Sequence, residues 1–461
     1  MISERYQLLL NAFDKAENGP VVDEKDWDLG AITKTVRLLI DEYDIHWDKD
    51  QIVPSDDALA DRLFAAGMEM AQEVGVLCID THRQMRWSRA EIETCLAAAP
   101  DTISAGLGAD RAEVLNRRPG DSQRVTVWGG PFGVPVSERL FQTILESYAV
   151  EPLIDILDNS TLLSTHGRPI RAGSPWEAVG AWQEAQQTLQ VIQKVGRPGL
   201  PLGCVDISTT EIGDMAGTTY GGYRPSDIHK LSFISEQKTA YHHLTKAAHF
   251  AHTESITEVY CNPMFGGYLG DDFGIAIGTV AGLILLNACY LGDIINAGPT
   301  HVKLAASTHP GIIRAMSAAF QAVSRNTHLL LSSHTRPTSG PGTIDIFREA
   351  AASIIAVVAS GASVVNCVQS AKGNNIGHCS PLEVRFGAQV AHASQGLSPS
   401  DANTIVSSLV EKFKDIQKKD NIGKTFVELH NLETFEPVPE WQALYEQAVA
   451  EMEVEYGLVM G

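Results

Sequence analysis

The second half of the chain alternates short β-branched segments with helical ones, and this alternation constrains the fold more than any other feature. Each short segment is almost continuously apolar, which is typical of strands buried on both faces of a parallel sheet. The units comprise strands 257–261, 293–299, 328–333 and 362–368, followed by helices 274–291, 310–326, 343–361 and 381–395. Four consecutive units predict a parallel sheet with helices outside it.

Upstream segments extend the pattern to eight strands. These are "STLLST" (160–165) and "GLPLGCV" (199–205), together with the candidates "TISAGLG" (102–108) and "VTVWGG" (125–130). Eight such strands predict an α/β fold, the closed (β/α)₈ TIM barrel. An open doubly wound sheet is the alternative, but no glycine-rich dinucleotide motif follows a strand, and Pro131 and Pro135 stand where its helix would begin.

The segments outside the barrel are predicted to be helical. Residues 1–100 are mostly amphipathic and form an N-terminal extension, residues 101–395 form the barrel, and residues 396–461 form a C-terminal segment that begins at a Ser-x-x-Asp cap. The apolar run 274–292 approaches the length of a membrane span. Its four glycines and its asparagine favour a helix in the protein core instead.

The composition and the first residues indicate the cellular compartment and disfavour some classes of binding partner. The chain has 35 basic and 56 acidic residues and a net charge of −21, which disfavours binding to nucleic acid or to anionic membranes. The first residues lack the basic start and the long apolar core of a secretion signal, so we expect a cytoplasmic protein. Seven cysteines without paired spacing indicate reduced thiols.

The active site of a TIM barrel lies at the carboxyl ends of its strands. The predicted ends carry a polar ring with no carboxylate, made of Cys204, Cys261, Asn296, His301, His334, Arg336, Asn366, Gln369 and Lys372. A guanidinium at this position offers a planar fork to a carboxylate. The ring therefore predicts a site for an anionic or zwitterionic small molecule.

Several chemistries remain open for this ring. Lys372 could form a Schiff base, as in a lyase or aldolase. Cys261, His301 and His334 could hold zinc in a methyltransferase for a thiol or methoxy compound, although no spacing indicates a metal site. The glycine-rich loop "YGGYRPSD" (220–227) could enclose a quaternary ammonium with its two tyrosines. A barrel that binds a small molecule without catalysis is a further alternative.

A set of motifs resembles one known family along essentially the whole chain. The motifs are "CIDTHR" (78–83), "GGPFGVPVSE" (129–138), "SYAVEPLID" (147–155), "GRPGL" (196–200), "MFGGYLG" (264–270), "SAKG" (370–373) and "GKTFVELH" (423–430). They closely resemble the monomethylamine methyltransferase family of methanogens. The resemblance implies a TIM barrel that binds no cofactor tightly and passes a methyl group to cobalt(I) of a corrinoid (cobalamin) held by a partner protein. It also implies a homo-oligomer, such as a hexamer.

The departures from that family suggest a different methyl donor. Gly203 stands where the family carries pyrrolysine, Lys230 and Tyr260 replace two glutamates, and His334 and Arg336 replace a Gln-x-Tyr pair. These changes identify a non-pyrrolysine member. They add positive charge, and at an effective dielectric near 20 a unit charge at ~4 Å is worth roughly 4 kcal/mol, so we expect methylammonium to be repelled.

The sequence thus predicts a donor that bears an acid group, such as a betaine or an N-methyl amino acid. Arg336 and Lys230 would clamp the acid, and Gly203 would free volume for a bulkier substrate. His334 and Tyr260 are the predicted catalytic residues, which orient the donor or protonate the departing amine. The predicted substrate-binding set is completed by Tyr220, Tyr223, Cys261, His301 and Lys372, and no residue is assigned to a metal.

Overall fold

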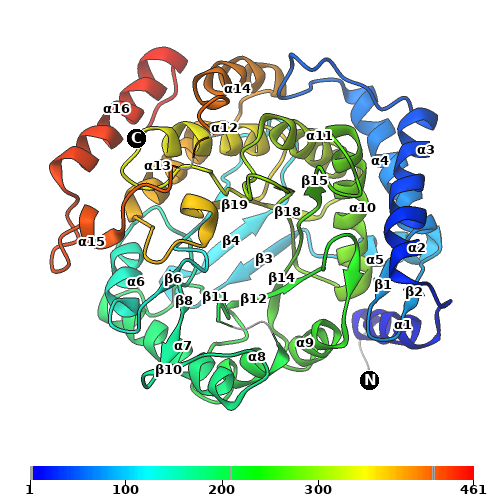
Figure 1. Cartoon of the computed structure of the whole chain (residues 1–461), viewed down its shortest axis with the longest axis horizontal. Helices are drawn as coiled ribbons and strands as arrows, with labels where there is room; N and C mark the ends of the chain where they lie inside the picture. Colours follow the sequence, from blue (N-terminus) through cyan, green and yellow to red (C-terminus); the bar gives the residue numbers. More distant parts are fainter. Residues whose placement is uncertain (1–3, 208–209, 418, 420) are drawn as a thin grey trace.

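Eight parallel strands form a closed ring in the computed structural model, which describes residues 4–207, 210–417, 419 and 421–461 (Figure 1). Their order around the ring is β11, β12, β14, β16, β18, β19, β5 and β7. A parallel bridge between Leu157 and Leu202 joins the last strand to the first and closes the ring. The predicted (β/α)₈ barrel is therefore confirmed.

The barrel strands confirm six of the eight predicted segments. They are β5 (Thr126–Gly129), β7 (Ile156–Leu157), β11 (Gly203–Cys204), β12 (Ile228–Ser232), β14 (Ile256–Cys261), β16 (Ile294–Ala297), β18 (Leu330–His334) and β19 (Val364–Cys367). Strands β7 and β12 take the places that were predicted for 160–165 and 102–108.

Those two predictions were wrong because each segment pairs locally outside the ring. Segment 102–108 contributes β3 (Thr102–Ala105), which pairs antiparallel with β4 (Ala112–Leu115) after a turn in which Gly106 and Gly108 have positive φ. Segment 160–165 is divided between β8 (Thr161–Leu162) and β9 (Ser164–Thr165). Strand β8 pairs with β6 (Pro135–Val136), and β9 pairs with β10 (Arg168–Pro169).

The side chains inside the barrel change from apolar to polar along the strands. Because alternate residues of a strand face the same side, positions two apart point inward together. The layer at the amino ends is apolar and includes Ile228, Ile256, Ile294, Leu330 and Val364. The next layer is polar and comprises Lys230, Glu258, Asn296, Ser332 and Asn366, and above it lie Ser232, Tyr260 and His334. The polar chemistry is thus confined to the carboxyl half of the barrel.

The hairpin of β3 and β4 closes the amino end of the barrel. Ala105, Ala112 and Val114 pack in one cluster with the apolar layer of the strands. Two backbone hydrogen bonds, from Gly106 to Ser226 and from Leu107 to Gly199, fix the hairpin below the ring. Figure 1 shows the two strands crossing the centre of the barrel, where they form an apolar floor.

Eight helices follow the eight strands and form the outer ring. They are α6 (Phe141–Ala149), α7 (Pro175–Lys194), α8 (Glu211–Gly217), α9 (Tyr241–His252), α10 (Asp272–Tyr290), α11 (Pro310–Asn326), α12 (Asp345–Ala359) and α13 (Pro381–Ala393). The short connections include β13 (Lys238–Thr239), β15 (Met264–Phe265), β17 (Thr300–His301) and the 3₁₀ turns η2 (Gly108–Asp110) and η3 (Ser370–Gly373).

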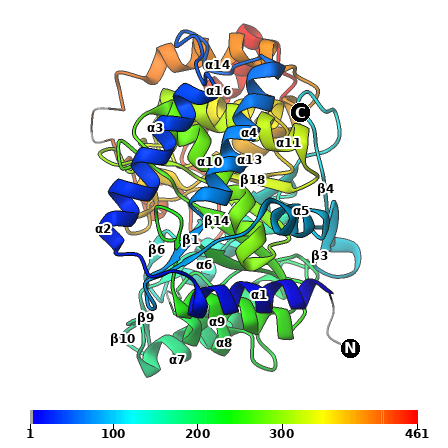
Figure 2. The ribbon, with the colours of Figure 1, turned by 90° about the vertical axis from the view of Figure 1, so that its right-hand side faces the viewer.

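The two terminal segments lie on different, neighbouring parts of this ring (Figures 1 and 2). The N-terminal part comprises α1 (Glu4–Asn18), α2 (Glu24–Asp26), the π-helix η1 (Trp27–Ile32), α3 (Thr33–Glu42), α4 (Asp57–Glu73), β1 (Val76–Cys78), β2 (Arg83–Met85) and α5 (Arg89–Ala97). Helix α4 packs on α10 and α11. The C-terminal helices are α14 (Pro399–Phe413), α15 (Phe426–Leu429) and α16 (Pro439–Tyr456), and α14 packs on α12. As predicted, Ser398 caps α14 through the amide of Asp401.

The apolar segment near residue 280 is a core helix. Helix α10, Asp272–Tyr290, is the one helix in the described ranges that is long and apolar enough to cross a membrane, and nearly all of it is buried. It packs against α4 and α11 outside and against β14 and β16 inside. All seven cysteines are buried and free, as the prediction of reduced thiols requires.

Candidate active site

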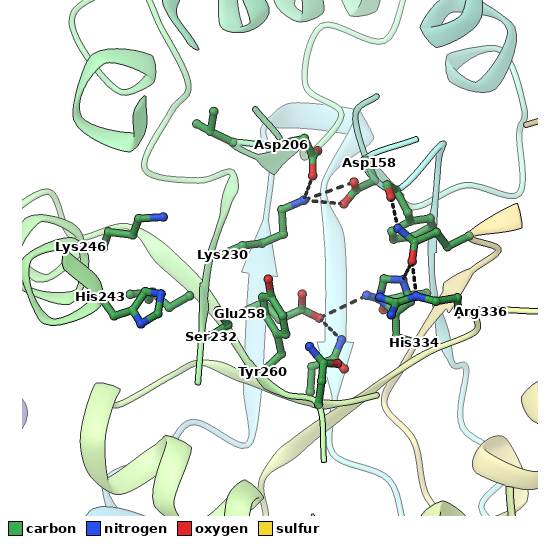
Figure 3. A pocket seen from close by; sticks show the side chains of 18 of the residues that line it. Asp158, Asp206, Lys230, Ser232, His243, Lys246, Glu258, Tyr260, His334 and Arg336 are labelled. Carbon is green, nitrogen blue, oxygen red and sulfur yellow. Dashed lines mark hydrogen bonds and ion pairs between the residues drawn. The ribbon is translucent and has the colours of Figure 1, made fainter. Parts of the chain in front are cut away.

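A cavity of about 440 Å³ opens at the carboxyl ends of the barrel strands. Figure 3 shows charged side chains pointing into it from β12 and β14 and from the segments after β7, β11 and β18. Its charged lining residues are balanced: Lys230, Lys246 and Arg336 face Asp158, Asp206 and Glu258. The remaining lining includes Phe132, Ser232, His242, His243, Tyr260, Asn262, Asn296, His334, Asn366 and Gln369.

Lys230 is held between two carboxylates. Its Nζ lies 2.6 Å from Asp206 Oδ1 and 3.2 Å from Asp158 Oδ2. Burial favours the neutral amine, but the two aspartates outweigh it and raise the pKa of Lys230 well above its ordinary value. Burial and the proximity of Asp206 also raise the pKa of Asp158. Lys230 is therefore a charged member of an ion-paired cluster and does not act as a separate anion clamp, contrary to the prediction.

The prediction that the strand ends carry no carboxylate was wrong. Asp158 directly follows β7, a strand that was missed, and Asp206 lies two residues after β11. Glu258 lies inside β14, two residues before Tyr260, so the alternation of the strand could have placed both side chains in the cavity. With three carboxylates in the lining, the expected net repulsion of methylammonium no longer follows.

Glu258 lies in the same layer of the barrel as Lys230, on the neighbouring strand. It is buried and accepts hydrogen bonds from the amides of Asn296 at 2.8 Å and Asn366 at 3.4 Å. Ser332 donates to Asn366 Oδ1 at 2.7 Å and completes the network. Burial raises the pKa of the Glu258 carboxyl. This network gives the bottom of the cavity an acidic, hydrogen-bonding surface.

Arg336 and His334 share one hydrogen-bond acceptor. Gln369 Oε1 accepts from Arg336 Nε at 2.6 Å and lies 3.1 Å from His334 Nε2, while Gln369 Nε2 donates to the carbonyl of Phe132 at 2.5 Å. Because the Phe132 carbonyl can only accept, the orientation of the Gln369 amide is fixed. His334 Nε2 must then carry the hydrogen, and Nδ1 keeps its lone pair.

The environment of His334 opposes a role as an acid. Burial, followed by the nearby Arg336, lowers the pKa of His334 to about 3. The ring of Phe132 lies edge-on against the imidazole, with 5.3 Å between the ring centroids. The imidazole is therefore neutral near pH 7, which contradicts the prediction that His334 protonates a departing amine. It remains a lining residue that can accept a hydrogen bond.

Arg336 has neutral partners only. Beyond Gln369, its Nη1 lies 3.4 Å from Thr300 Oγ1, and no carboxylate of the described ranges lies within 4 Å of the guanidinium. The side chain is largely buried at the edge of the cavity, and burial lowers the pKa of its guanidinium. A buried cation without a counter-ion is energetically costly, so Arg336 is well suited to bind an anion.

Gly203 does not leave vacant volume. A Cβ atom at this position would lie 2.5 Å from Asp158 Oδ2 and 2.6 Å from Trp128 Cζ2. Gly203 is also absent from the cavity lining. The prediction that this glycine makes room for a bulkier substrate was wrong, because Trp128 and Asp158 already fill the space.

Five other predicted substrate-binding residues lie outside the cavity lining. Tyr220 is fully exposed on its loop. Cys261 alternates with Tyr260 on β14 and points outward against Gly282 of α10. His301 on β17 packs against Phe265, with 5.3 Å between the ring centroids. Lys372 lies half-buried in η3.

The fifth, Tyr223, supports the site from behind. Its hydroxyl donates to Glu184 Oε1 at 2.7 Å, and Glu184 accepts the backbone amides of Asp206 at 3.2 Å and Ile207 at 3.1 Å. Burial raises the pKa of Glu184 to about 8. Tyr223 and Glu184 thus hold the segment that carries Asp206.

Neither of the alternative chemistries gains support from the geometry. Across the part of the chain that the structure describes, no group of three or more His, Cys, Asp and Glu residues is arranged to hold a metal ion. Cys261 and His301 do not converge with His334 on the cavity, as the zinc alternative requires. Lys372, the candidate for a Schiff base, does not reach the cavity lining either.

Comparison with known proteins shows likeness over the full length. The family model described as monomethylamine methyltransferase MtmB matches residues 8–458. Monomethylamine methyltransferases MtmB2 of Methanosarcina acetivorans and MtmB of Methanosarcina mazei are each 30% identical over 451 residues, 97% of this chain and of each relative. The crystal structures of the Methanosarcina barkeri monomethylamine methyltransferase and of the hydroxylamine MtmB complex match with a TM-score of 0.95, 29% identity and 98% coverage of both chains. The likeness thus extends over the barrel and both terminal segments.

Proposed function

Since the chain belongs to the monomethylamine methyltransferase family and is a methyltransferase, we propose that it takes the methyl group from a small zwitterionic N-methyl compound. Betaines and N-methyl amino acids are the class of donor. The acceptor is cobalt(I) of a corrinoid held by a separate partner protein, as the family resemblance implies. Gly203 takes the place of the family's pyrrolysine in this proposal.

The largely buried guanidinium of Arg336 is the observation that carries the choice of donor. It lines the cavity, and among the residues that the structure describes its partners are the neutral Gln369 and Thr300. A carboxylate can accept two parallel hydrogen bonds from such a fork and supply the missing counter-charge. Methylamine has no carboxylate, so it would leave the Arg336 guanidinium without a negatively charged partner.

The other end of the donor faces the acidic part of the cavity. Asp158 and Asp206 supply two carboxyl groups beside the one ammonium of Lys230, and Glu258 lies in the same layer of the barrel as Lys230. Tyr260 follows Glu258 by two positions on β14, so both side chains face the cavity. A methylated ammonium group is attracted by these carboxylates and by the face of an aromatic ring.

The chemistry requires no proton from the chain. The cobalt(I) corrinoid supplies the electron pair that takes the methyl group. The C–N bond breaks with both of its electrons left on nitrogen, so a quaternary or protonated nitrogen departs as a neutral amine. This agrees with a neutral His334, whose pKa is about 3. The residues of the chain hold the donor at both ends and so fix the orientation of its methyl group for transfer.

Binding and turnover of a matched panel test the proposal. Glycine betaine, dimethylglycine, sarcosine, tetramethylammonium and methylamine are titrated by calorimetry and then offered as donors to a cobalt(I) corrinoid protein. We expect the acid-bearing compounds to bind best. Arg336→Gln should weaken them about 100-fold, since losing one partner of a buried charge pair costs about 2–5 kcal/mol.

The surface variant Arg325→Gln is the matched control, because Arg325 pairs with Asp57 and Asp61 far from the cavity. It should leave binding unchanged. Preferred turnover of methylamine, with no effect of Arg336→Gln on any donor, would refute the zwitterionic assignment and leave the family's own amine as the donor.

A further inference from the structure

Glu349 is a fully buried carboxylate on α12 that lies outside the cavity lining. Its two oxygens accept five hydrogen bonds, all from neutral groups. The donors are Thr308 Oγ1, Thr338 Oγ1, Gln417 Nε2 and the backbone amides of Thr338 and Ser339. A buried carboxylate is costly unless such donors satisfy it, so losing any one of these contacts carries a penalty.

Two of the five hydrogen bonds fix the backbone directly after Arg336. Thr338 and Ser339 follow Arg336 by two and three positions in the chain. Their amides donate to Glu349 at 2.9 and 3.1 Å, and the Thr338 hydroxyl donates to it at 2.9 Å. The position of this carboxylate on α12 therefore determines the path of the chain as it leaves Arg336.

The same backbone segment holds the hydrogen-bond partner of Arg336. The amide of Gln369 donates to the carbonyl of Thr335 at 2.9 Å, and the amide of Ala371 donates to the carbonyl of Ser339 at 3.1 Å. Gln369 Oε1 in turn accepts from Arg336 Nε at 2.6 Å. A displacement of the segment would thus move the guanidinium and its acceptor together.

A second connection from Glu349 to Arg336 passes through Thr308, whose hydroxyl donates to the carboxylate. The neighbouring Ser307 exchanges two hydrogen bonds with the backbone of Arg336. The Arg336 amide donates to Ser307 Oγ at 2.8 Å, and the Ser307 amide donates to the Arg336 carbonyl at 2.9 Å. Because the Ser307 hydroxyl also donates to the carbonyl of His334 at 3.0 Å, this connection holds both lining residues.

The C-terminal segment supplies the remaining donor. Gln417 follows α14 and is 4% exposed, and its Nε2 lies 3.0 Å from Glu349 Oε2 and 2.9 Å from the carbonyl of Thr308. Further along, the carbonyl of Asn421 accepts the amide of Gly340 at 2.8 Å. A segment outside the barrel therefore contributes to the support of this corner of the cavity.

We propose that Glu349 is a positioning residue that holds Arg336 in the orientation in which the guanidinium meets the acid group of the donor. The inference rests on the proposed function, in which Arg336 binds that group. The contacts explain why the position requires a carboxylate. Backbone amides can only donate, and those of Thr338 and Ser339 contact different oxygens of Glu349. A glutamine side chain in either orientation sets an N–H against one of these two amides, so Glu349→Gln keeps the shape and loses part of the support.

A double-variant cycle of donor binding tests the proposal. Glycine betaine is titrated by calorimetry into the wild type, Glu349→Gln, Arg336→Gln and the double variant. We expect Glu349→Gln to weaken binding about tenfold, because a small misplacement of a binding group is costly. It should cause no further loss once Arg336 is replaced, since residues that act through one another are not additive. Tetramethylammonium, which has no acid group, should bind equally to the wild type and to Glu349→Gln.

Glu451→Gln is the matched control for a loss of stability. Glu451 on α16 is also a buried carboxylate, but it pairs with Arg348 and Lys412, each at 2.9 Å, and does not line the cavity. This variant should lower Tm and leave the affinity for glycine betaine unchanged. Equal weakening of binding in Glu349→Gln and Glu451→Gln would overturn the proposal, because the position of Arg336 would then not be the cause.

The NMR signal of the His334 ring gives a readout that needs no donor. Displacement of the supported backbone should move this signal in Glu349→Gln, and Glu451→Gln should leave it in place. Gln417→Met removes one of the five donors, should move the signal less, and serves if Glu349→Gln does not fold. An unmoved signal in both variants would contradict the positioning role.

The two measurements separate this inference from the proposed function. If glycine betaine binding depends on Arg336 but not on Glu349, the positioning role fails and the proposed donor class stands. If no acid-bearing compound binds to the wild type, the proposed donor class fails, and the His334 signal alone decides whether Glu349 supports this corner.

Discussion

Replacing Lys230 by methionine should destabilise the protein more strongly as the pH rises. Lys230 Nζ lies 2.6 Å from Asp206 and 3.2 Å from Asp158. At these distances and an effective dielectric near 20, each attraction is about 5–6 kcal/mol before desolvation is subtracted. Breaking a buried ion pair from one side costs about 3–5 kcal/mol net. With an unfolding entropy of about 2.1 cal/mol/K per residue, a chain of 461 residues should lose about 3–5 °C in Tm.

The direction of the pH effect follows from the proton that Asp158 binds. Burial and Asp206 already raise the pKa of Asp158 above its value in the unfolded chain, and removing Lys230 takes away the charge that opposes them. The folded variant therefore holds a proton that the unfolded chain releases just above pH 4. The stability of the variant then falls as the pH rises from about 4 toward the raised pKa of Asp158. The loss in Tm relative to the wild type should therefore be larger at pH 8 than at pH 5.

Thermal unfolding of three variants at both pH values provides the measurement. Lys230→Met should show the pH-dependent loss, and Lys230→Met with Asp206→Asn should recover most of it because one carboxylate is gone. Lys194→Met, which removes a lysine from the surface, should stay close to the wild type at both pH values. The same loss at pH 5 and pH 8, or no loss at all, would refute an ionised cluster around Lys230.

Two further predictions concern packing and protonation. Gly203→Ala places a methyl group 2.5 Å from Asp158 Oδ2 and 2.6 Å from Trp128 Cζ2. Such overpacking costs about 1–3 kcal/mol. We therefore expect calorimetry to show a lower Tm and activity assays to show slower methyl transfer. Gly30→Ala, with no atom within 4 Å of the added methyl, is the control; equal stability of the two variants would mean that room exists at Gly203. Burial and Arg336 lower the pKa of His334 to about 3, so the NMR signal of its ring should not move between pH 5 and pH 8. The signal is identified by its loss in His334→Gln. Titration near neutral pH would contradict a neutral imidazole.

The barrel could be predicted from sequence where its strands are continuously apolar. Strands β16, β18 and β19 carry such runs, and the predicted segments coincide with them. Strand β12 was missed because its middle residue is Lys230, which interrupts the apolar pattern. Strand β7 has only two residues, Ile156 and Leu157, too few for any periodicity. The sequence signal was weakest where a strand is very short or carries a charged residue at its centre.

The residues of the candidate site also differ in how well the sequence predicts them. His334 and Arg336 were identified correctly as lining residues because they end a strand that sequence reveals. Their partners depend on which segments the barrel brings together, and Asp158, 72 positions from Lys230, has no local signature in the sequence. The packing of Trp128 against residue 203 likewise exists only in three dimensions.

The floor formed by β3 and β4 also bears on the order in which donor and acceptor can bind. Across the described residues, the cavity opens at the carboxyl ends of the strands, while the apolar cluster with Ala105, Ala112 and Val114 closes the other end. A methyl acceptor that docks over the open end would block the route by which the next donor arrives. Donor and acceptor must then bind in a compulsory order, with the donor first. An excess of acceptor protein would slow the enzyme, because it would occupy molecules whose cavity is still empty.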